Sequence, residues 1–313
     1  MKDFLKCKVC GKDFKNTRGK HLHISKIHGI STLEYYKKYD VKLSLLHQKK
    51  IKYKNLNQYL NDDFVNREEL IDWCLKEKPE IVKPYIKNLL INRKKEKNLN
   101  YSLSSIELEL SNLPTIDIYK SLFGSYIELC EEIGFEVFLN QKIPEGFFDQ
   151  QNELEKIFVD TREQKPIQFD NQESMKLDFG DYTCSSPNYD YTYIDRKSES
   201  DLKSTLSGDN FLRFKRELDR ARSFNSFIFV IVESDINKTI KNNIFSPHKS
   251  KLPYIWHNLK SLSQEYRDCC QFVFAGNRNG LKKLIYKILY YGKRLWRVDL
   301  QYFINKEIYE RIK

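Results

Sequence analysis

The sequence contains no run of about 18 apolar residues and no apolar segment directly after its first residues. A helix that crosses a membrane needs about 20 predominantly apolar residues, and a secretory signal needs an apolar core of roughly 7–15. The chain begins MKDFLKC, which provides neither. We therefore expect an intracellular protein without a membrane partner.

Cysteine pairs that would form a disulfide framework are also missing. The chain has seven cysteines, an odd number, and five of them are scattered, mostly among apolar neighbours: Cys74, Cys130, Cys184, Cys269 and Cys270. The pattern excludes a small secreted domain held together by disulfides, and these five are expected to be buried reduced thiols. Cys7 and Cys10 differ from them, because their spacing is that of metal ligands.

Acidic residues are scarce in the first part of the chain. Residues 1–60 contain 15 lysines and arginines but 4 aspartates and glutamates, whereas residues 61–313 contain 39 of each kind. The whole net charge of +11 therefore lies within residues 1–60, and this segment is expected to meet polyanions first. A lysine-rich solvated surface would have the same composition, but the motifs within the segment favour nucleic acid.

Four potential metal ligands have the spacing C-x2-C-x12-H-x4-H: Cys7, Cys10, His23 and His28. Zinc takes four such ligands in a tetrahedron, and this spacing supplies them from a hairpin and a helix. Residues 4–29 thereby resemble a Cys2His2 zinc finger, a small ββα unit with a structural Zn²⁺ ion. Lys20 stands where such a finger usually has a core leucine, so Leu22, Ile24 or Ile27 must fill the core.

Base reading by this finger is expected to be weak. The positions that read bases in such a finger fall on Asn16, Gly19 and Leu22, and of these only Asn16 can bond to a base edge. Affinity and orientation are expected to come from basic residues that contact phosphates: Lys12, Lys15, Arg18, Lys20 and Lys26. A protein-binding finger is the alternative, which the local charge disfavours.

A helical spacer is predicted after the finger. Helical patterns occur over three segments: residues 33–39, 67–76 and 85–97. The basic run at 93–97 is interpreted as an exposed helix end or a linker. Residues 114–136 predict a helical hairpin in which Ser125 caps the second helix and Gly134 ends it. This hairpin resembles the small repeat attached to homing endonucleases, which implies contact with DNA; a hairpin that only packs a linker is the alternative.

Two carboxylates and a lysine follow the pattern of a metal-dependent site for phosphodiester cleavage. Residues 175–182 alternate apolar and polar side chains as a half-buried strand does, and residues 191–197 are aromatic and β-branched. Turn-forming residues separate the two segments, so the chain is expected to fold back and place Asp181 beside Asp195. Side chains two apart on a strand share a face, so Lys197 is expected to point to the same side as Asp195.

Further motifs occur in a fixed order around these residues: VDTRE at 159–163, GD at 180–181, DRKSESD at 195–201 and RFKREL at 213–218. Residues 155–293 thereby resemble the nuclease domain of the XPF family, although Asp195 stands where that family usually has glutamate. The resemblance implies an α/β fold of the restriction-endonuclease type, in which helices flank a mixed sheet. Residues 226–233 and 271–275 have the apolar composition of its inner strands.

The resemblance also implies a catalytic metal and the residues that serve it. Carboxylate oxygens suit Mg²⁺ or Mn²⁺, and the expected ligands are Asp160, Asp181 and Asp195. Lys197 is expected to position or activate the attacking water and to offset charge in the transition state. Glu163 is a further catalytic candidate, either as a direct ligand or through water.

Neighbouring residues have supporting roles in this hypothesis. Arg162 and Arg196 are expected either to bind phosphate or to brace the carboxylates. Asp201 either caps the helix that follows or joins the outer shell of the metal. Arg213 and Arg216 are candidates for phosphate contacts, with a solvated helix flank as the alternative.

Together the motifs predict three segments: a zinc finger at 1–30, a basic helical spacer at 31–148 and an XPF-like nuclease domain at 149–313. The predicted function is a metal-dependent endonuclease for double-stranded DNA, of the homing type found in phage and mobile elements, at work in the cytoplasm of a bacterial host. A homodimer through the nuclease domain is a further expectation. The alternatives are a structure-specific nuclease for branched or flapped DNA and a non-catalytic DNA-binding protein with a nuclease-like fold.

Overall fold

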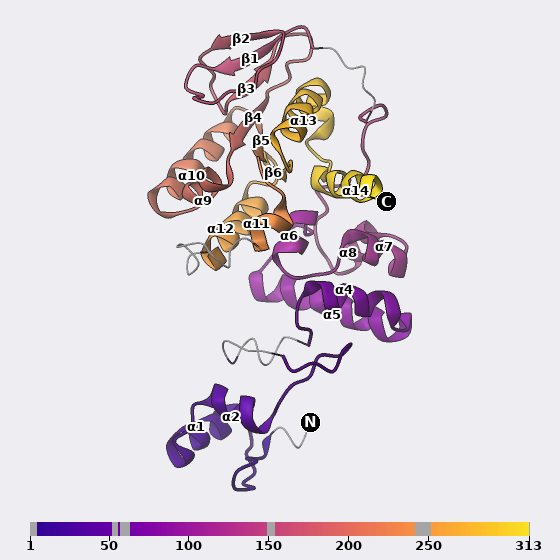
Figure 1. Ribbon diagram of the computed structural model, residues 1–313, viewed down its shortest axis with the longest axis vertical. Helices are drawn as coiled ribbons and strands as arrows, with labels where there is room; N and C mark the ends of the chain where they lie inside the picture. The colour runs from indigo at the N-terminus through magenta and orange to yellow at the C-terminus, as the bar shows by residue number, and fades with distance from the viewer. Residues whose placement is uncertain (1–4, 52–55, 57–62, 149–153, 242–251, 313) are drawn as a thin grey trace. The chain divides into compact units, whose positions relative to one another are not determined.

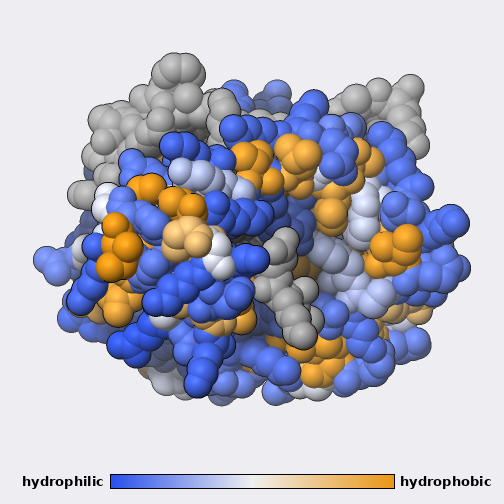
Figure 2. Space-filling view, turned by 90° about the horizontal axis from the view of Figure 1, so that it is seen from below, coloured by the Kyte–Doolittle hydropathy of each residue, from blue (hydrophilic) through white to orange (hydrophobic). Residues whose placement is uncertain are grey.

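The computed structural model describes residues 5–51, 56, 63–148, 154–241 and 252–312 (Figure 1). The chain divides into two compact units, one of residues 1–86 with 112–114, the other of residues 87–111 with 115–313. Within the described ranges, every helix is too short or too polar to cross a membrane. On the face drawn in Figure 2, hydrophilic side chains predominate and hydrophobic ones occur in separate groups.

The first unit begins with the finger. A single β-bridge between Lys6 and Asp13 stands where a two-stranded hairpin was predicted. Helix α1 (Thr17–His28) follows, and the side chain of Asn16 caps it by accepting a hydrogen bond from the backbone of Gly19. The predicted helix at 33–39 is confirmed as α2 (Thr32–Tyr39).

Two further predicted helices are confirmed beyond the finger. Residues 67–76 form α4 (Arg67–Lys76), which Asn66 caps. Residues 85–97 belong to α5 (Pro79–Lys97), which begins six residues earlier than the periodicity indicates. This helix starts in the first unit, and from Lys87 onward it belongs to the second.

A six-stranded sheet forms the centre of the second unit. Its strands are β1 (Ile157–Asp160), β2 (Gln172–Met175), β3 (Tyr182–Cys184), β4 (Thr192–Lys197), β5 (Phe227–Val232) and β6 (Cys270–Phe274). They are ordered β2-β1-β3-β4-β5-β6. β3 is antiparallel to β1 and β4, and the other neighbours are parallel. The predicted mixed sheet is therefore confirmed.

Helices cover both faces of this sheet (Figure 1). On one face lie α9 (Glu199–Thr205), α10 (Gly208–Ser223) and α12 (Leu252–Glu265), and on the other α13 (Arg278–Tyr291) and α14 (Leu300–Ile312). Strand β5 is wholly buried because all of its six residues are apolar and alternate between the two cores. Helix α14 was not predicted. Helix α11 (Ile236–Lys241) and the short 3-10 helix η4 (Gly292–Leu295) also belong to this unit.

The predicted hairpin at 114–136 is confirmed as α7 (Ile116–Phe123) and α8 (Tyr126–Glu132), and Ser125 caps α8. Together with α6 (Ser105–Leu110), these helices belong to the same compact unit as the sheet. Buried polar contacts connect the two parts: Ser105 donates to the carboxylate of Asp299 from its backbone (2.7 Å) and its hydroxyl (3.0 Å). Half of the predicted spacer therefore belongs to the same compact unit as the sheet.

Candidate functional site

Three predicted carboxylates lie in one row across neighbouring strands. The antiparallel registers, extended by one residue, place Asp160 opposite Asp181 and Asp181 opposite Asp195. A hydrogen bond supports the first of these pairs, because the backbone N–H of Asp160 donates to the carbonyl of Asp181 (2.8 Å). The backbone N–H of Asp181 donates to the carbonyl of Ile194 (2.7 Å), the residue next to Asp195. Residues directly opposite in antiparallel strands project to the same face.

The predicted strand at 175–182 is interrupted, and the interruption positions Asp181. β2 ends at Met175 and β3 begins at Tyr182. Gly180 between them has a φ of +56°, and a Cβ atom there would lie 2.6 Å from the carbonyl oxygen of Ile194. Only glycine allows this close approach, which brings Asp181 against β4.

Asp195 and Lys197 point to the same side of β4, as predicted. The Nζ atom of Lys197 donates to Oδ1 of Asp195 at 2.6 Å. Asp195 is 4% exposed, and its Oδ2 atom is buried without a hydrogen-bond partner among the described residues. The backbone N–H of Arg196 donates to Oδ2 of Asp181 at 2.7 Å, so β4 itself holds the two carboxylates together.

The pKa of Asp181 is raised in this pair even though the ammonium group of Lys197 lies beside it. Burial raises the pKa of Asp181 to about 8, and the nearby charge of Asp195 adds to the rise, while Lys197 opposes it. A carboxyl group with such a pKa keeps its proton at neutral pH unless a cation joins it. Burial and the charge of Asp195 therefore disfavour the ionised form of Asp181 in this conformation.

Glu217 on α10 is a member of this cluster that sequence reasoning missed. Burial raises its pKa, and the charge of Asp195 raises it further, while Lys197 and the backbone N–H of Gly180 oppose the rise. A signal was present in the sequence, because Glu217 is spaced at i+3 from Phe214 and faces the same side as that buried residue.

Asp160 and Glu163 are engaged by arginines. Both oxygens of Asp160 accept hydrogen bonds from Arg162 (2.7–2.9 Å), and Oδ2 also accepts one from the backbone of Leu177 (2.7 Å). Burial raises the pKa of Asp160, but these bonds outweigh it and hold the pKa at about 2. Glu163 forms an ion pair with Arg196 at 3.0 Å. The two arginines therefore brace carboxylates in this conformation.

The metal-ligand roles of Asp160 and Glu163 remain predictions. The oxygens of Asp160 already have donors, so a metal would have to displace Arg162. Ser198 caps α9 by accepting a hydrogen bond from the backbone N–H of Asp201 (3.1 Å), and the Ser198 hydroxyl donates to the Asp201 carboxylate (2.6 Å). Ser198, and not Asp201, is therefore the cap of α9, and an outer-shell role for Asp201 remains a prediction.

The predicted phosphate contacts on α10 occupy its solvent-facing side. Arg213 and Arg216 are both exposed. Arg213 lies one helical turn before Glu217, and residues four apart on a helix are neighbours. A phosphate bound at Arg213 would therefore lie on the same side of α10 as the carboxylate cluster, and both contacts remain predictions.

The four predicted zinc ligands converge in the finger. The distances from Cys7 Sγ to His28 Nε2, from Cys10 Sγ to His23 Nε2 and between the two imidazole Nε2 atoms are 3.5, 3.2 and 3.1 Å. All four ligand atoms lie within 4.8 Å of one another. Among the described residues, this is the only group of three or more such side chains gathered closely enough to hold a metal, so the carboxylates of the sheet do not form one in this conformation. Two thiolates and two imidazoles suit zinc.

Lys20 corrects a predicted phosphate contact. Its side chain is 0% exposed, and its Nζ atom lies 5.2 and 5.0 Å from the ring centroids of Tyr35 and Tyr36 and 3.7 Å from Asp40. The ammonium group is held inside the unit by aromatic rings and a carboxylate, so it does not face DNA. Ile24, which is fully buried, replaces the missing core leucine.

The other finger residues predicted to touch DNA are on the surface: Lys12, Lys15, Asn16, Arg18 and Lys26. Oδ1 of Asn16 is used in capping α1, which leaves its amide nitrogen for a base. His21 is not among the four clustered ligands and bonds to the hydroxyl of Tyr36 at 3.0 Å. Contact of the exposed residues with DNA remains a prediction.

The raised pKa of Asp181 predicts how metal-free stability depends on pH. A folded-state pKa of about 8 lies above the ordinary value of 3.8 for an aspartate, so the contribution of Asp181 to stability is full below about pH 4 and is lost as the pH rises through 8. We expect Asp181→Asn, in chelator, to be more stable than wild type by a margin that grows by roughly 1 kcal/mol per pH unit between about pH 4 and 8.

Urea unfolding of both proteins at several pH values measures this margin. Added Mg²⁺ is expected to reduce it, because the ion stabilises the carboxylate that asparagine lacks. A margin that is the same at pH 5 and pH 8 would show that Asp181 titrates as an ordinary carboxyl group.

Similarity to known proteins is found among solved structures. No protein-family model matches the chain, and no curated protein matches it. Among solved structures, the chain is similar to XPF from Aeropyrum pernix, alone and in a complex with DNA, at 18% sequence identity in both cases and with TM-scores of 0.33 and 0.32. The matches cover 45% and 43% of this chain and 66% and 62% of those chains, so the chain spans somewhat less than two thirds of the proteins it matches.

Proposed function

We propose that the protein is a metal-dependent nuclease that hydrolyses phosphodiester bonds of double-stranded DNA. One observation carries the proposal: the buried Oδ2 atom of Asp195 has no hydrogen-bond partner among the described residues and adjoins Asp181, with Lys197 alongside. Buried polar atoms are nearly always satisfied. Two adjoining carboxylates with one unused oxygen fit a hard cation such as Mg²⁺ or Mn²⁺.

Asp181 and Asp195 would hold the ion, and Glu217 adds a third carboxylate nearby. When bound, such an ion polarises a phosphate oxygen and lowers the pKa of a water. Lys197 carries its proton through the reaction, because the adjacent charge of Asp195 raises its pKa against the effect of burial. Its ammonium group is therefore suited to stabilise the negative charge that develops on phosphate. Arg162 and Arg196 keep the surrounding carboxylates in place.

The finger would supply DNA affinity in this proposal. Cys7, Cys10, His23 and His28 would hold Zn²⁺, and the exposed basic residues of the finger would contact phosphates. The charge map supports this division, because residues 1–60 hold the whole net charge. We infer a homing-type endonuclease on this basis, since a separate basic module can bring duplex DNA to the cleavage site whether or not the DNA is branched.

Cleavage of matched substrates tests the proposal. The full chain with Zn²⁺ is incubated with linear duplexes and with branched duplexes of the same sequence, with Mg²⁺ or with chelator. We expect Mg²⁺-dependent cleavage of the linear duplex, at sites that end sequencing of a random-sequence library identifies. Cleavage of branched DNA alone would favour a structure-specific nuclease, and no cleavage with Mg²⁺ or Mn²⁺ would overturn the proposal.

A further inference from the structure

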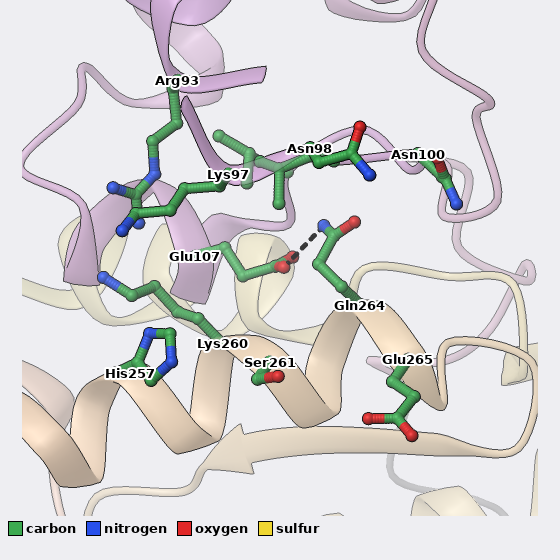
Figure 3. Close-up of a pocket in the computed structure, with 12 residues that line it drawn as sticks. Arg93, Lys97, Asn98, Asn100, Glu107, His257, Lys260, Ser261, Gln264 and Glu265 are labelled. Carbon is green, nitrogen blue, oxygen red and sulfur yellow. Dashed lines mark hydrogen bonds between the residues drawn. The ribbon is translucent and has the colours of Figure 1, made fainter. Parts of the chain in front are cut away.

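A cavity of about 250 Å³ opens within the second unit, apart from the carboxylate row. It lies between the end of α5, the segment at 97–103, α6 and α12 (Figure 3). Arg93 and Lys97 reach it from α5 and Lys260 from α12. In Figure 3 the ends of these three side chains converge on one side of the cavity. The run at 93–97, interpreted above as an exposed helix end, thus contributes two cations to a hollow.

The acids of the cavity have partners of their own. Glu107 is fully buried and forms an ion pair with Arg267, and it also accepts hydrogen bonds from Gln264 (2.8 Å) and from the backbone of Ser104 (2.8 Å). Glu265, at the rim, forms an ion pair with Lys215 at 2.7 Å.

The three converging cations are therefore left in excess. Glu96, which follows on α5, and Glu107 each offset part of the charge of Arg93, and Glu107 also acts on Lys260. Because Glu107 is shared with Arg267 as well, these two acids face four cations, and a local surplus of positive charge is left. A surplus of this kind attracts anions.

Hydrogen-bond donors in the cavity are also in excess. The Nε atom of Arg93 is buried and has no partner among the described residues. Lys260 donates to the carbonyl of Leu110 at 2.8 Å, and an ammonium group has three protons. Burial and the charge of Arg93 lower the pKa of Lys260 to about 8. Crowded cations with unused donors favour a ligand that brings both negative charge and several acceptor oxygens.

We propose that this cavity is a phosphate-binding site in which Arg93, Lys97 and Lys260 hold one phosphate group. A guanidinium fork matches phosphate oxygens in its geometry, and lysines add point charges. The amide side chains of Asn98 and Asn100 lie at the rim (Figure 3) and offer further donors. The group is either a backbone phosphate of nucleic acid or a free phosphate. The site is distinct from the proposed cleavage centre and does not depend on it.

Inorganic phosphate tests the site in the full chain. Thermal unfolding is measured in phosphate and in chloride at equal ionic strength for wild type and for Arg93→Gln, Lys97→Gln and Lys260→Gln. Lys283→Gln is the matched control, because Lys283 is exposed on α13 and lies outside the cavity. We expect phosphate to raise Tm in wild type and in the control, and each cavity variant to lose half of that rise or more.

Lys97 is exposed, so Lys97→Gln keeps the test valid if the buried substitutions reduce folding. The proposal would be overturned if phosphate raised Tm equally in the control and in all three cavity variants. It would also be overturned if phosphate did not raise Tm in wild type and the cavity variants bound DNA as wild type does. Phosphate should raise the Tm of Asp181→Asn as much as that of wild type. A nuclease proposal that fails in the cleavage assay therefore leaves the result for this cavity unaffected, and the reverse also holds.

Binding of a labelled duplex without divalent ions identifies the source of the phosphate. If a DNA phosphate occupies the cavity, each variant lowers the slope of log K against log salt by about one. If a free phosphate is the ligand, the slope stays as in wild type while the Tm effect is lost. Either result supports the cavity as a phosphate site.

Discussion

Replacing Asp181 with asparagine is expected to reduce divalent-ion-dependent DNA cleavage by about 10³-fold or more while leaving DNA affinity nearly unchanged. Asparagine keeps the size of the side chain, and its amide oxygen can still accept the hydrogen bond from the backbone of Arg196. It lacks the carboxylate charge that Asp181 would offer to a metal ion beside the unused oxygen of Asp195. Lys197→Met should have a comparable effect, because it removes the cation that would offset charge on phosphate.

Single-turnover cleavage with saturating protein measures this loss, and anisotropy with a labelled duplex measures affinity. Asp178→Asn is the matched control, since Asp178 is exposed and precedes Asp181 by three residues. The expected stability of Asp181→Asn in chelator separates loss of chemistry from loss of fold. If Asp181→Asn and Lys197→Met both cleave like wild type, these residues do not form the catalytic centre.

Removing the finger's metal is expected to have the second large effect, the loss of ordered structure in the finger. The finger core is small, with Cys7, Ile24, Tyr35, Tyr36 and Ile51 as its buried residues. Structural zinc contributes about 10–16 kcal/mol in finger peptides, far more than so small a core supplies. We therefore expect Cys10→Ser to lose zinc, to become sensitive to proteolysis within the finger and to bind duplex DNA at least about tenfold more weakly, because phosphate contacts dominate affinity.

His21→Gln is the control for this variant, because its imidazole bonds to Tyr36 and is not among the clustered ligands. Zinc content, limited proteolysis and DNA affinity are measured on both proteins. Cleavage by Cys10→Ser should recover at saturating DNA, since the carboxylate row belongs to the other compact unit. Retention of one zinc per chain and of wild-type affinity in Cys10→Ser would contradict the assignment.

Local patterns in the sequence predicted several elements well. The alternation and spacing of apolar residues indicated α2, α4, the α7–α8 hairpin and the all-apolar strand β5, because helix and strand periodicities depend on near neighbours alone. The ligand spacing of the finger and the pairing of Asp181 with Asp195 were predictable for the same reason. Each depends on a short segment that folds back on itself.

Other features depended on side-chain contacts that helix and strand periodicities do not record. Lys20 was expected on the surface, yet the rings of Tyr35 and Tyr36 bury it. Asp160 was expected to face a metal, yet Arg162 and the backbone of Leu177 use its oxygens.

The sequence by itself therefore determined the residue types and local spacings of two predicted metal sites, soft ligands in the finger and carboxylates in the sheet. The tertiary structure alone decided which charges remain unsatisfied. It brought Glu217 of α10 close enough for the charge of Asp195 to act on it, and it brought Arg93 of α5 to Lys260 of α12. The physical reason is that burial and charge pairing depend on contacts between elements that are distant along the chain, and no local period records those contacts.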